Sequence, residues 1–398
     1  MRTIKVGSDF SGVGAFNQAL TRLDINYQEV FACDMDKYAR QTFIHNYGEP
    51  KYYPLNVYDR EIPSEPLDIY MTSPPCQAFS MAGKRLGKED KRGILFFNSL
   101  EFIRVNNPRF FIFENVKGLL SHDKENKKNK IGKTFQEWID YLGGKSVNGI
   151  ATMMPIDGSV PYHLHYKVLN AKKHGVPQNR ERVFLIGIRD DQDNTFTWPK
   201  EEELTKRLKD VLENEVDDKY FLSEKMMRFV LTTNFKEAKP IDINRAEAPC
   251  VKTGGDVSCF DVNNLIKIKS ATSKGYQEAT EGDSINFSVP NSQTRRGRVG
   301  KGVAQTLDTG CNQAIIYNDK RLNATIQKNT LKEKFTGNNP PIIQENYSIR
   351  RLTPRECFRL MDFPDTFTWP VSDSQAYKQA GNSIVVRVLE KIIKNLNL

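Results

Sequence analysis

The chain has 398 residues, of which 38% are hydrophobic and 27% charged, a composition typical of a globular protein large enough for two domains. It has no uninterrupted apolar run of the roughly 18 residues that a membrane span needs, and its first residues lack a signal-peptide pattern. The net charge of +9 and the pI near 9.0 favour a polyanionic partner, although solvated lysines alone would give the same charge.

Short apolar strands alternate with helices along the first part of the chain. The pattern predicts strands over 3–8, 27–32, 67–72 and 110–113, and helices over about 15–23 and 93–106. Two further strands, 166–169 and 182–188, are expected to form a hairpin at the sheet edge. This alternation is typical of βαβ units, so we expect an α/β fold built on a parallel, Rossmann-like sheet.

The pattern changes after residue 192. Residues 193–346 are polar and lack the strand–helix rhythm, whereas 347–398 regain order and end in a helix from about Ile384. We therefore expect a first domain over 1–192, a smaller irregular domain over 193–346 and a C-terminal segment over 347–398.

The cysteines favour reduced thiols over a structural scaffold. They lie at positions 33, 76, 250, 259, 311 and 357. No two of them form a C-x-x-C pair, so we expect neither a zinc site nor a disulfide framework, and no metal.

Cys76 follows a predicted strand and two prolines, in Pro74-Pro75-Cys76-Gln77. Prolines fix the backbone, and in an open α/β sheet ligands bind at the carboxyl ends of the strands. Such a thiol is either a nucleophile or a buried cysteine that acts as a small hydrophobe. The tetrapeptide alone does not separate the two.

The first turn contains Gly12 and Gly14, but Asn17 stands where a dinucleotide fingerprint has its third glycine. This argues against a nicotinamide enzyme and fits a nucleoside ligand without a pyrophosphate. Asp34, twenty residues after Gly14, has the spacing of an acid that binds ribose hydroxyls, and Met35 and Phe10 are candidates to flank an adenine. The alternative is a surface acid beside two core residues.

Two more groups end or begin strands on the same rim. Glu114 ends the strand 110–113, where burial would raise its pKa and suit it to donate a proton. Arg180 and Arg182 share a strand face, so they could hold a phosphate or a base edge together. The alternatives are a water-facing glutamate and solvated edge-strand arginines.

Six motifs, in this order, resemble those of the DNA (cytosine-5)-methyltransferases of the bacterial restriction-modification type. They are residues 9–14, 75–77, 114–116, 178–182, 351–356 and 381–383. The resemblance covers nearly the whole chain outside 193–346. The family's first motif often reads D-x-F-x-G-x-G-G; here Ser8 takes the place of its aspartate and Ala15 that of its last glycine.

The resemblance implies methyl transfer from S-adenosylmethionine to C5 of a cytosine flipped out of duplex DNA, on a Rossmann-like sheet with a target-recognition domain over 193–346. Cys76 would add to C6, Glu114 would protonate N3, and Arg182 and Arg180 would grip O2. Residues 347–398 would form a hinge and a C-terminal helix that returns to the catalytic domain.

The resemblance also implies a set of cofactor contacts. They are Phe10, Ser11, Gly12, Val13, Asp34, Met35, Asn56, Val57, Pro75, Leu95, Asn382 and Ser383. Asn56 stands where the family generally has an acid near the adenine.

For DNA, residues 78–95 resemble the family's mobile loop, with the expected contacts Ser80, Lys84, Arg85 and Lys88. In the second domain the expected contacts are Arg295, Arg296 and Arg298, for which a solvated face is the alternative. The resemblance implies a cytoplasmic, nucleoid-associated monomer whose partner is double-stranded DNA. It leaves the recognition sequence open, and also whether a cognate restriction endonuclease acts separately.

Three other functions were weighed. A tRNA cytosine-5 methyltransferase would keep the chemistry, but the Cys-Phe-Thr signature of that group is absent. A nicotinamide oxidoreductase leaves Cys76 and Glu114 unexplained. A DNA-binding protein without catalysis would not need either residue.

Overall fold

The computed structural model describes residues 2–75, 95–124, 131–222, 266–289, 297–318 and 347–398. Contacts divide the chain into two compact units. Unit 1 comprises Met1–Lys206, Asp308–Cys311 and Cys357–Leu398, and unit 2 comprises Arg207–Leu307 and Asn312–Glu356. Within the described residues, no helix is both long and apolar enough to cross a membrane.

These units do not begin and end at the expected positions 192 and 346. Residues 193–206 group with unit 1, where Glu202 donates its backbone N–H to Lys173 O at 2.9 Å and pairs with Lys391 at 2.7 Å. Residues 347–356 group with unit 2, because their strand pairs with its sheet.

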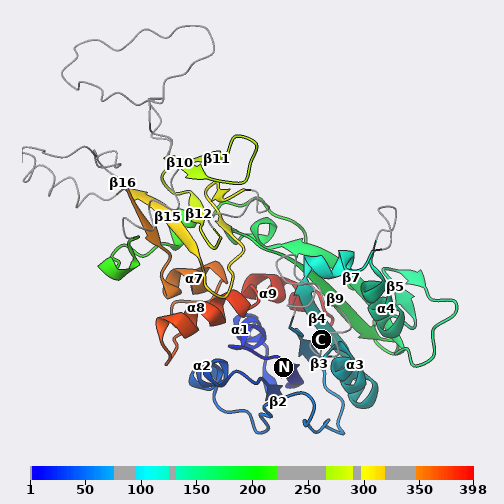
Figure 1. The fold of residues 1–398 in the computed structure, drawn as a ribbon. Coiled ribbons are helices and arrows are strands. Elements are labelled where there is room, and N and C mark those ends of the chain that lie inside the picture. The colour runs from blue at the N-terminus through cyan, green and yellow to red at the C-terminus, as the bar shows by residue number, and fades with distance from the viewer. Residues whose placement is uncertain (1, 76–94, 125–130, 223–265, 290–296, 319–346) are drawn as a thin grey trace, which may run out of the picture. The chain divides into compact units, whose positions relative to one another are not determined.

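Unit 1 is built on an eight-stranded sheet with the order β2-β1-β3-β4-β9-β7-β5-β6 (Figure 1). Its strands are β1 (Ile4–Asp9), β2 (Tyr27–Cys33), β3 (Ile69–Thr72), β4 (Phe110–Val116), β5 (Ser146–Val147), β6 (Ile150–Ala151), β7 (Tyr162–Asn170) and β9 (Glu181–Arg189). The first four are parallel, but β9 runs antiparallel to both β4 and β7. The sheet is therefore mixed, not wholly parallel as expected.

The predicted hairpin at the sheet edge exists as the antiparallel pair β7 and β9, but its position was wrong. Strand β9 lies between β4 and β7, and the short hairpin of β5 and β6 follows beyond β7. An interior position suits β9 because residues 183–188 are all buried. Strand β4 runs on to Val116, so Glu114 lies inside a strand and not past its end.

Helices cover the sheet. The helices of unit 1 are α1 (Ala15–Arg22), α2 (Lys37–Tyr47), α3 (Leu95–Asn106), α4 (Lys133–Leu142), α8 (Asp373–Asn382) and α9 (Val386–Lys394), with the 3-10 turns η2 (Lys117–Ser121) and η3 (Ala171–His174) and the short strand β8 (Gln178–Asn179). Helices α3 and α4 bury Phe96 and Trp138, whose rings stack at 4.1 Å, against Phe113 of β4.

The C-terminal helix α9 packs beside α1 (Figure 1). Arg22 at the end of α1 donates to Asp362 O at 3.0 Å and pairs with Glu390 of α9 at 3.0 Å. The expected return of the C-terminal segment to the first unit is thus seen in these contacts.

The strand order places a ligand site. Because β1 lies between β2 and β3, the connections that leave β1 and β2 run to opposite sides of it. In doubly wound sheets this switch point opens a crevice at the carboxyl ends of the strands. Strands β1 to β4 end there at Asp9, Cys33, Thr72 and Val116.

Unit 2, expected to be irregular, contains a small antiparallel sheet in its described part. Its elements are β10 (Ile266–Lys269), β11 (Tyr276–Ala279), β12 (Ser284–Asn286), β13 (Val299–Gly300), β14 (Ala304–Gln305), β15 (Gln313–Asn318), β16 (Tyr347–Arg351), η4 (Leu208–Val211) and η5 (Asp218–Tyr220). The sheet order is β13-β12-β15-β16, and β10 pairs with β11. Ile268, Ile285, Ile316 and Ile349 form its apolar cluster.

The motif at 351–356 has a structural explanation. Glu356 accepts the backbone N–H of Thr353 at 2.9 Å, and Thr353 Oγ1 accepts that of Glu356 at 3.2 Å, which is a reciprocal capping box at the start of helix α7 (Pro354–Leu360). Arg350 donates to both oxygens of Glu356, at 2.8 and 2.7 Å. All of these groups are buried.

Candidate active site

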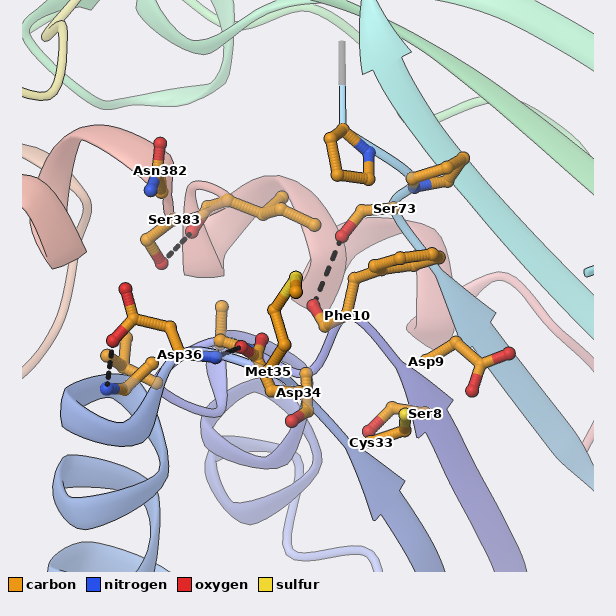
Figure 2. Close-up of a pocket in the computed structure, with 18 of the residues that line it drawn as sticks. Ser8, Asp9, Phe10, Cys33, Asp34, Met35, Asp36, Ser73, Asn382 and Ser383 are labelled. Atoms are coloured by element: carbon orange, nitrogen blue, oxygen red, sulfur yellow. Dashed lines mark hydrogen bonds between the residues drawn. The ribbon is translucent and has the colours of Figure 1, made fainter. Parts of the chain in front are cut away.

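A cavity of about 540 Å³ opens at the carboxyl ends of β1 to β4 (Figure 2). Its volume lies in the usual range for a small-molecule site. All of the predicted cofactor residues line it: Phe10, Ser11, Gly12, Val13, Asp34, Met35, Asn56, Val57, Pro75, Leu95, Asn382 and Ser383. The fold therefore brings together residues that are up to 373 positions apart in the sequence, from Phe10 to Ser383 (383 − 10).

The turn between β1 and α1 forms one wall. Gly14 has a φ of 84°, and a Cβ there would lie 2.3 Å from the Tyr47 ring, so the position requires glycine for both reasons. Ser11 donates its backbone N–H to Cys33 O at 3.0 Å, and Gly12 donates to Asp34 Oδ2 at 2.7 Å. These bonds tie the turn to the end of β2.

Asp34 has the properties expected of a ribose-binding acid. Its Oδ1 accepts the backbone N–H of Asp36 at 2.8 Å, while Oδ2 holds Gly12. Burial raises the pKa of Asp34 more than these two N–H donors lower it. Each carboxylate oxygen can accept a further hydrogen bond, so the acid retains capacity for hydroxyl donors in the cavity.

Asp36 connects this wall to the C-terminal segment. It caps α2 by accepting the N–H groups of Tyr38 and Ala39 at 2.9 and 3.2 Å, and Lys378 Nζ lies 2.6 Å from its second oxygen. Lys378 also lines the cavity. Sequence reasoning missed Lys378; its position one helical turn before Asn382 is the signal that could have found it.

The opposite wall, residues 55–58, is anchored from below by Arg60. This guanidinium donates to Asp9 through Nε at 2.9 Å and Nη2 at 2.7 Å, and Tyr70 donates its hydroxyl to the same carboxylate at 2.5 Å. Asn56 Oδ1 accepts the N–H groups of Tyr58 and Asp59, which fixes the local turn. No sequence spacing links Arg60 to Asp9, because the two residues belong to different elements.

Met35 stands out on this rim because its side chain is 78% exposed. Figure 2 shows it between Phe10 and Asp34. A large apolar group left open beside a buried acid fits a site that an apolar ring would cover. The residues present therefore fit a nucleoside cofactor: an acid for the ribose, apolar side chains for the base and close backbone approach at the turn.

The other end of the cavity holds Glu114 and Arg182. In the register of β4 and β9, Glu114 faces Phe184, so Arg182, two residues away, lies on the same face of the sheet. The Arg182 Nε lies 3.0 Å from Glu114 Oε1. Burial raises the pKa of Glu114 more than the charges of Arg182 and Arg180 lower it. The carboxyl is thus suited to proton transfer near neutral pH.

Arg180 lines the cavity but its guanidinium turns toward the C-terminal segment. It is 3% exposed, and its Nη2 donates to Gly381 O at 3.0 Å and Ser383 O at 2.7 Å. The expectation that both arginines share a face holds, but their hydrogen-bond partners differ. A contact between Arg180 and the base stays a prediction.

Some predicted residues lie outside the described part of the chain. They are Cys76, Ser80, Lys84, Arg85, Lys88, Arg295 and Arg296. Pro75, the residue before Cys76, lines the cavity, and Asn115 of β4 donates to Pro74 O at 3.3 Å. The chain therefore enters this segment beside Glu114.

Arg298 corrects one expectation. Its side chain was expected on the surface as a DNA contact, but the residue is only 4% exposed. Its guanidinium donates to Asn286 O at 3.1 Å and to Val289 O. Burial and these bonds give Arg298 a structural part in its loop.

The described cysteines are buried free thiols, and no cluster of three metal-ligating side chains occurs among the described residues. A nucleoside-sized cavity at the switch point of an α/β sheet, with a buried acid at one end and a carboxyl–guanidinium pair at the other, defines a nucleoside-cofactor enzyme.

Comparisons with known proteins identify the family. The family model of C-5 cytosine-specific DNA methylase matches residues 4–397. The orphan methyltransferase M.SPRI of Bacillus phage SPR is 32% identical over the whole chain and 98% of its own length. The type II methyltransferase M1.ScrFI of Lactococcus lactis subsp. cremoris is 30% identical, over 97% of this chain and 76% of its own. The chain belongs to the C-5 cytosine-specific DNA methylase family.

A solved structure agrees in fold. The S. pombe Dnmt2 methyltransferase has a TM-score of 0.55 at 18% identity and covers 99% of this chain and 100% of its own. The predicted family, α/β fold class and cofactor are confirmed: the protein is a DNA cytosine-5 methyltransferase, and S-adenosylmethionine is its methyl donor. This function is favoured over the tRNA alternative and replaces the nicotinamide one.

Proposed function

We propose that Cys76, Glu114 and Arg182 carry out the reaction at one cytosine flipped out of duplex DNA. The observation that carries this assignment is the ion pair of Glu114 and Arg182, which lines the same cavity as the predicted cofactor residues. Pro75, next to Cys76 in sequence, lines that cavity too. A base whose C6 meets the thiol would have its N3 and O2 within reach of a carboxyl and a guanidinium.

The first step activates the ring. The Cys76 thiolate forms a bond from Sγ to C6, and Glu114 donates a proton to N3, so that the electron pair of the broken C5–C6 double bond comes to rest in an enamine. Arg182 donates to O2 and stabilises the charge that develops there. Without the proton on N3, C6 is too electron-rich for addition.

S-adenosylmethionine, when bound, supplies an electrophilic methyl group to C5. Asp34 would accept the ribose hydroxyls, Phe10 and Met35 would flank the adenine, and Asn382 and Ser383 would close the site. Once C5 carries the methyl group, a base removes the C5 proton, and the electron pair returns to the C5–C6 bond as Cys76 Sγ leaves. Glu114 regains its proton from N3.

Residues 193–346 serve as the target-recognition region in this proposal, with Arg295 and Arg296 near the DNA and residues 78–95 as the loop that follows the nucleophile. All residues assigned to the reaction belong to one chain, which supports a monomer. A cognate endonuclease and a cytoplasmic, nucleoid-associated location stay predictions.

Tritiated methyl transfer tests the proposal. Duplex DNA and tRNA are compared as acceptors, and the product is hydrolysed to nucleosides. We expect label in 5-methyldeoxycytidine from duplex DNA only, at a fixed set of sites in bisulfite sequencing. Label in tRNA alone, or in another nucleoside, would refute it.

A further inference from the structure

The segment 178–182 makes two kinds of contact. Arg182 pairs with Glu114, whereas Gln178 and Arg180 contact the C-terminal segment. Gln178 Nε2 donates to Leu360 O at 2.7 Å, and Arg180 Nη2 bridges two carbonyls at the end of α8. Neighbouring arginines on one strand face therefore have different partners.

The carbonyls that Arg180 holds are well placed for a cation. Gly381 O and Ser383 O belong to the last turn of α8 and its cap, where carbonyls lack helical partners and carry the negative end of the helix dipole. A buried guanidinium on such carbonyls forms charge-assisted hydrogen bonds. Between these two carbonyls lies Asn382, which lines the cavity.

The other side of α8 is held by helix α2. Lys378 contacts Asp36 at 2.6 Å, and Gln379 bonds Thr42 Oγ1 at 3.0 Å and Tyr38 O at 2.9 Å. These contacts fix the helix, but they precede its last three residues. Arg180 is the described side chain whose printed hydrogen bonds hold the carbonyls on both sides of Asn382.

We propose that Arg180 is a positioning residue of the cofactor site: it holds residues 381–383 so that Asn382 and Ser383 meet S-adenosylmethionine, and base contact belongs to Arg182 alone. This inference rests on the proposed function for the identity of the site. It replaces a pair of base-gripping arginines with a division between substrate and cofactor.

Equilibrium binding of S-adenosylmethionine to the full-length protein without DNA is the primary test. We expect R180M to weaken binding about tenfold, the usual effect of losing a charge-assisted hydrogen bond, and R180K to weaken it less because lysine keeps the charge. The matched control R182M should bind within about twofold of wild type, since distant sites act independently.

A double-mutant cycle adds a readout that general destabilisation would not give. N382A should weaken binding in the wild-type background but have little further effect in R180M, because the segment is already displaced. Additive losses would overturn the proposal. Unchanged affinity in R180M would do the same.

Covalent trapping on duplex DNA with 5-fluorocytosine separates the base side. At saturating S-adenosylmethionine, R180M should regain most of the wild-type complex and R182M should not. If R180M stays as defective as R182M, Arg180 acts on the base and the proposal is wrong. If R180M does not fold in a thermal melt, R180K decides: wild-type affinity in R180K overturns it. Failure of the wild type to trap DNA would refute the proposed function, while the affinity comparison would still judge Arg180.

Discussion

Glu114 and Arg182 meet across the antiparallel pair of β4 and β9, with 3.0 Å between Nε and Oε1. Burial and the guanidinium act in opposite directions on the carboxyl. Burial is the larger effect, so the pKa of Glu114 lies above its ordinary value. A carboxyl that must give a proton and regain it within one cycle is served by such a balance.

Replacement of Glu114 by glutamine should lower the rate of methyl transfer by roughly 100-fold to 10,000-fold, the usual contribution of a general acid. Affinity for S-adenosylmethionine should be unchanged, because Asp34 and the turn at Gly12 lie at the other end of the cavity. Single-turnover transfer of labelled methyl and equilibrium binding measure the two quantities. Wild-type turnover in E114Q would remove Glu114 from the mechanism.

The pH profile gives a second reading of the same residue. Glu114 donates only when protonated, so the wild-type rate should fall as pH rises through its raised pKa. The opposite limb, at lower pH, belongs to protonation of the Cys76 thiolate. E114Q should lack the high-pH fall, and persistence of that fall in E114Q would assign it to another group.

Asp34 should control cofactor affinity without control of the chemical step. D34N keeps the shape but loses the charge that attracts hydroxyl donors, so we expect binding of S-adenosylmethionine to weaken roughly tenfold. The rate at saturating cofactor should stay near that of wild type. A thermal melt checks the bonds to Gly12 and Asp36, and weak binding with an unchanged melt is the expected result.

Sequence reasoning worked where a function requires a residue type at the end of a predictable strand. Asp34 and Glu114 are such cases, since the alternation of strands and helices places both at one rim of the sheet. The positions Asn382 and Ser383 came from the ordered motifs, because nothing local in the sequence shows that they approach β1.

Other features depended on tertiary pairing that no local pattern encodes. Strand β9 looked like an edge strand, yet antiparallel pairing with β4 puts it inside the sheet and sets Arg182 beside Glu114. Arg298 looked like a surface charge, but nearby carbonyls bury it. The buried pair of Arg60 and Asp9 joins elements 51 residues apart.

The buried pair of Arg350 and Glu356 should matter for the stability of unit 2. Removal of one partner leaves a buried charge, so R350M or E356Q should cost about 3–5 kcal/mol of unfolding free energy. Urea unfolding measures the change. The matched control is D365N, whose partner Arg359 is more exposed and whose loss should cost about 0–1 kcal/mol. Equal costs for the two pairs would contradict this ranking.

Glu29 in β2 gives a pH-dependent prediction. Its Oε1 is buried without a hydrogen-bond partner among the described residues, and burial raises its pKa to about 8 from 4.5. The raised pKa favours the folded state below pH 4.5, and this contribution is lost as pH rises to about 8. The unfolding free energy of wild type relative to E29Q should fall by about 1.4 kcal/mol per pH unit in that interval. A difference that does not vary with pH would contradict the assignment.

The most direct measurement of the central claim is mass spectrometry of the protein trapped on duplex DNA that carries 5-fluorocytosine. The account predicts one cross-linked peptide, with the base joined to the sulfur of Cys76, and no complex in C76S. A complex that forms equally well with C76S, or a cross-link at another residue, would contradict the covalent mechanism.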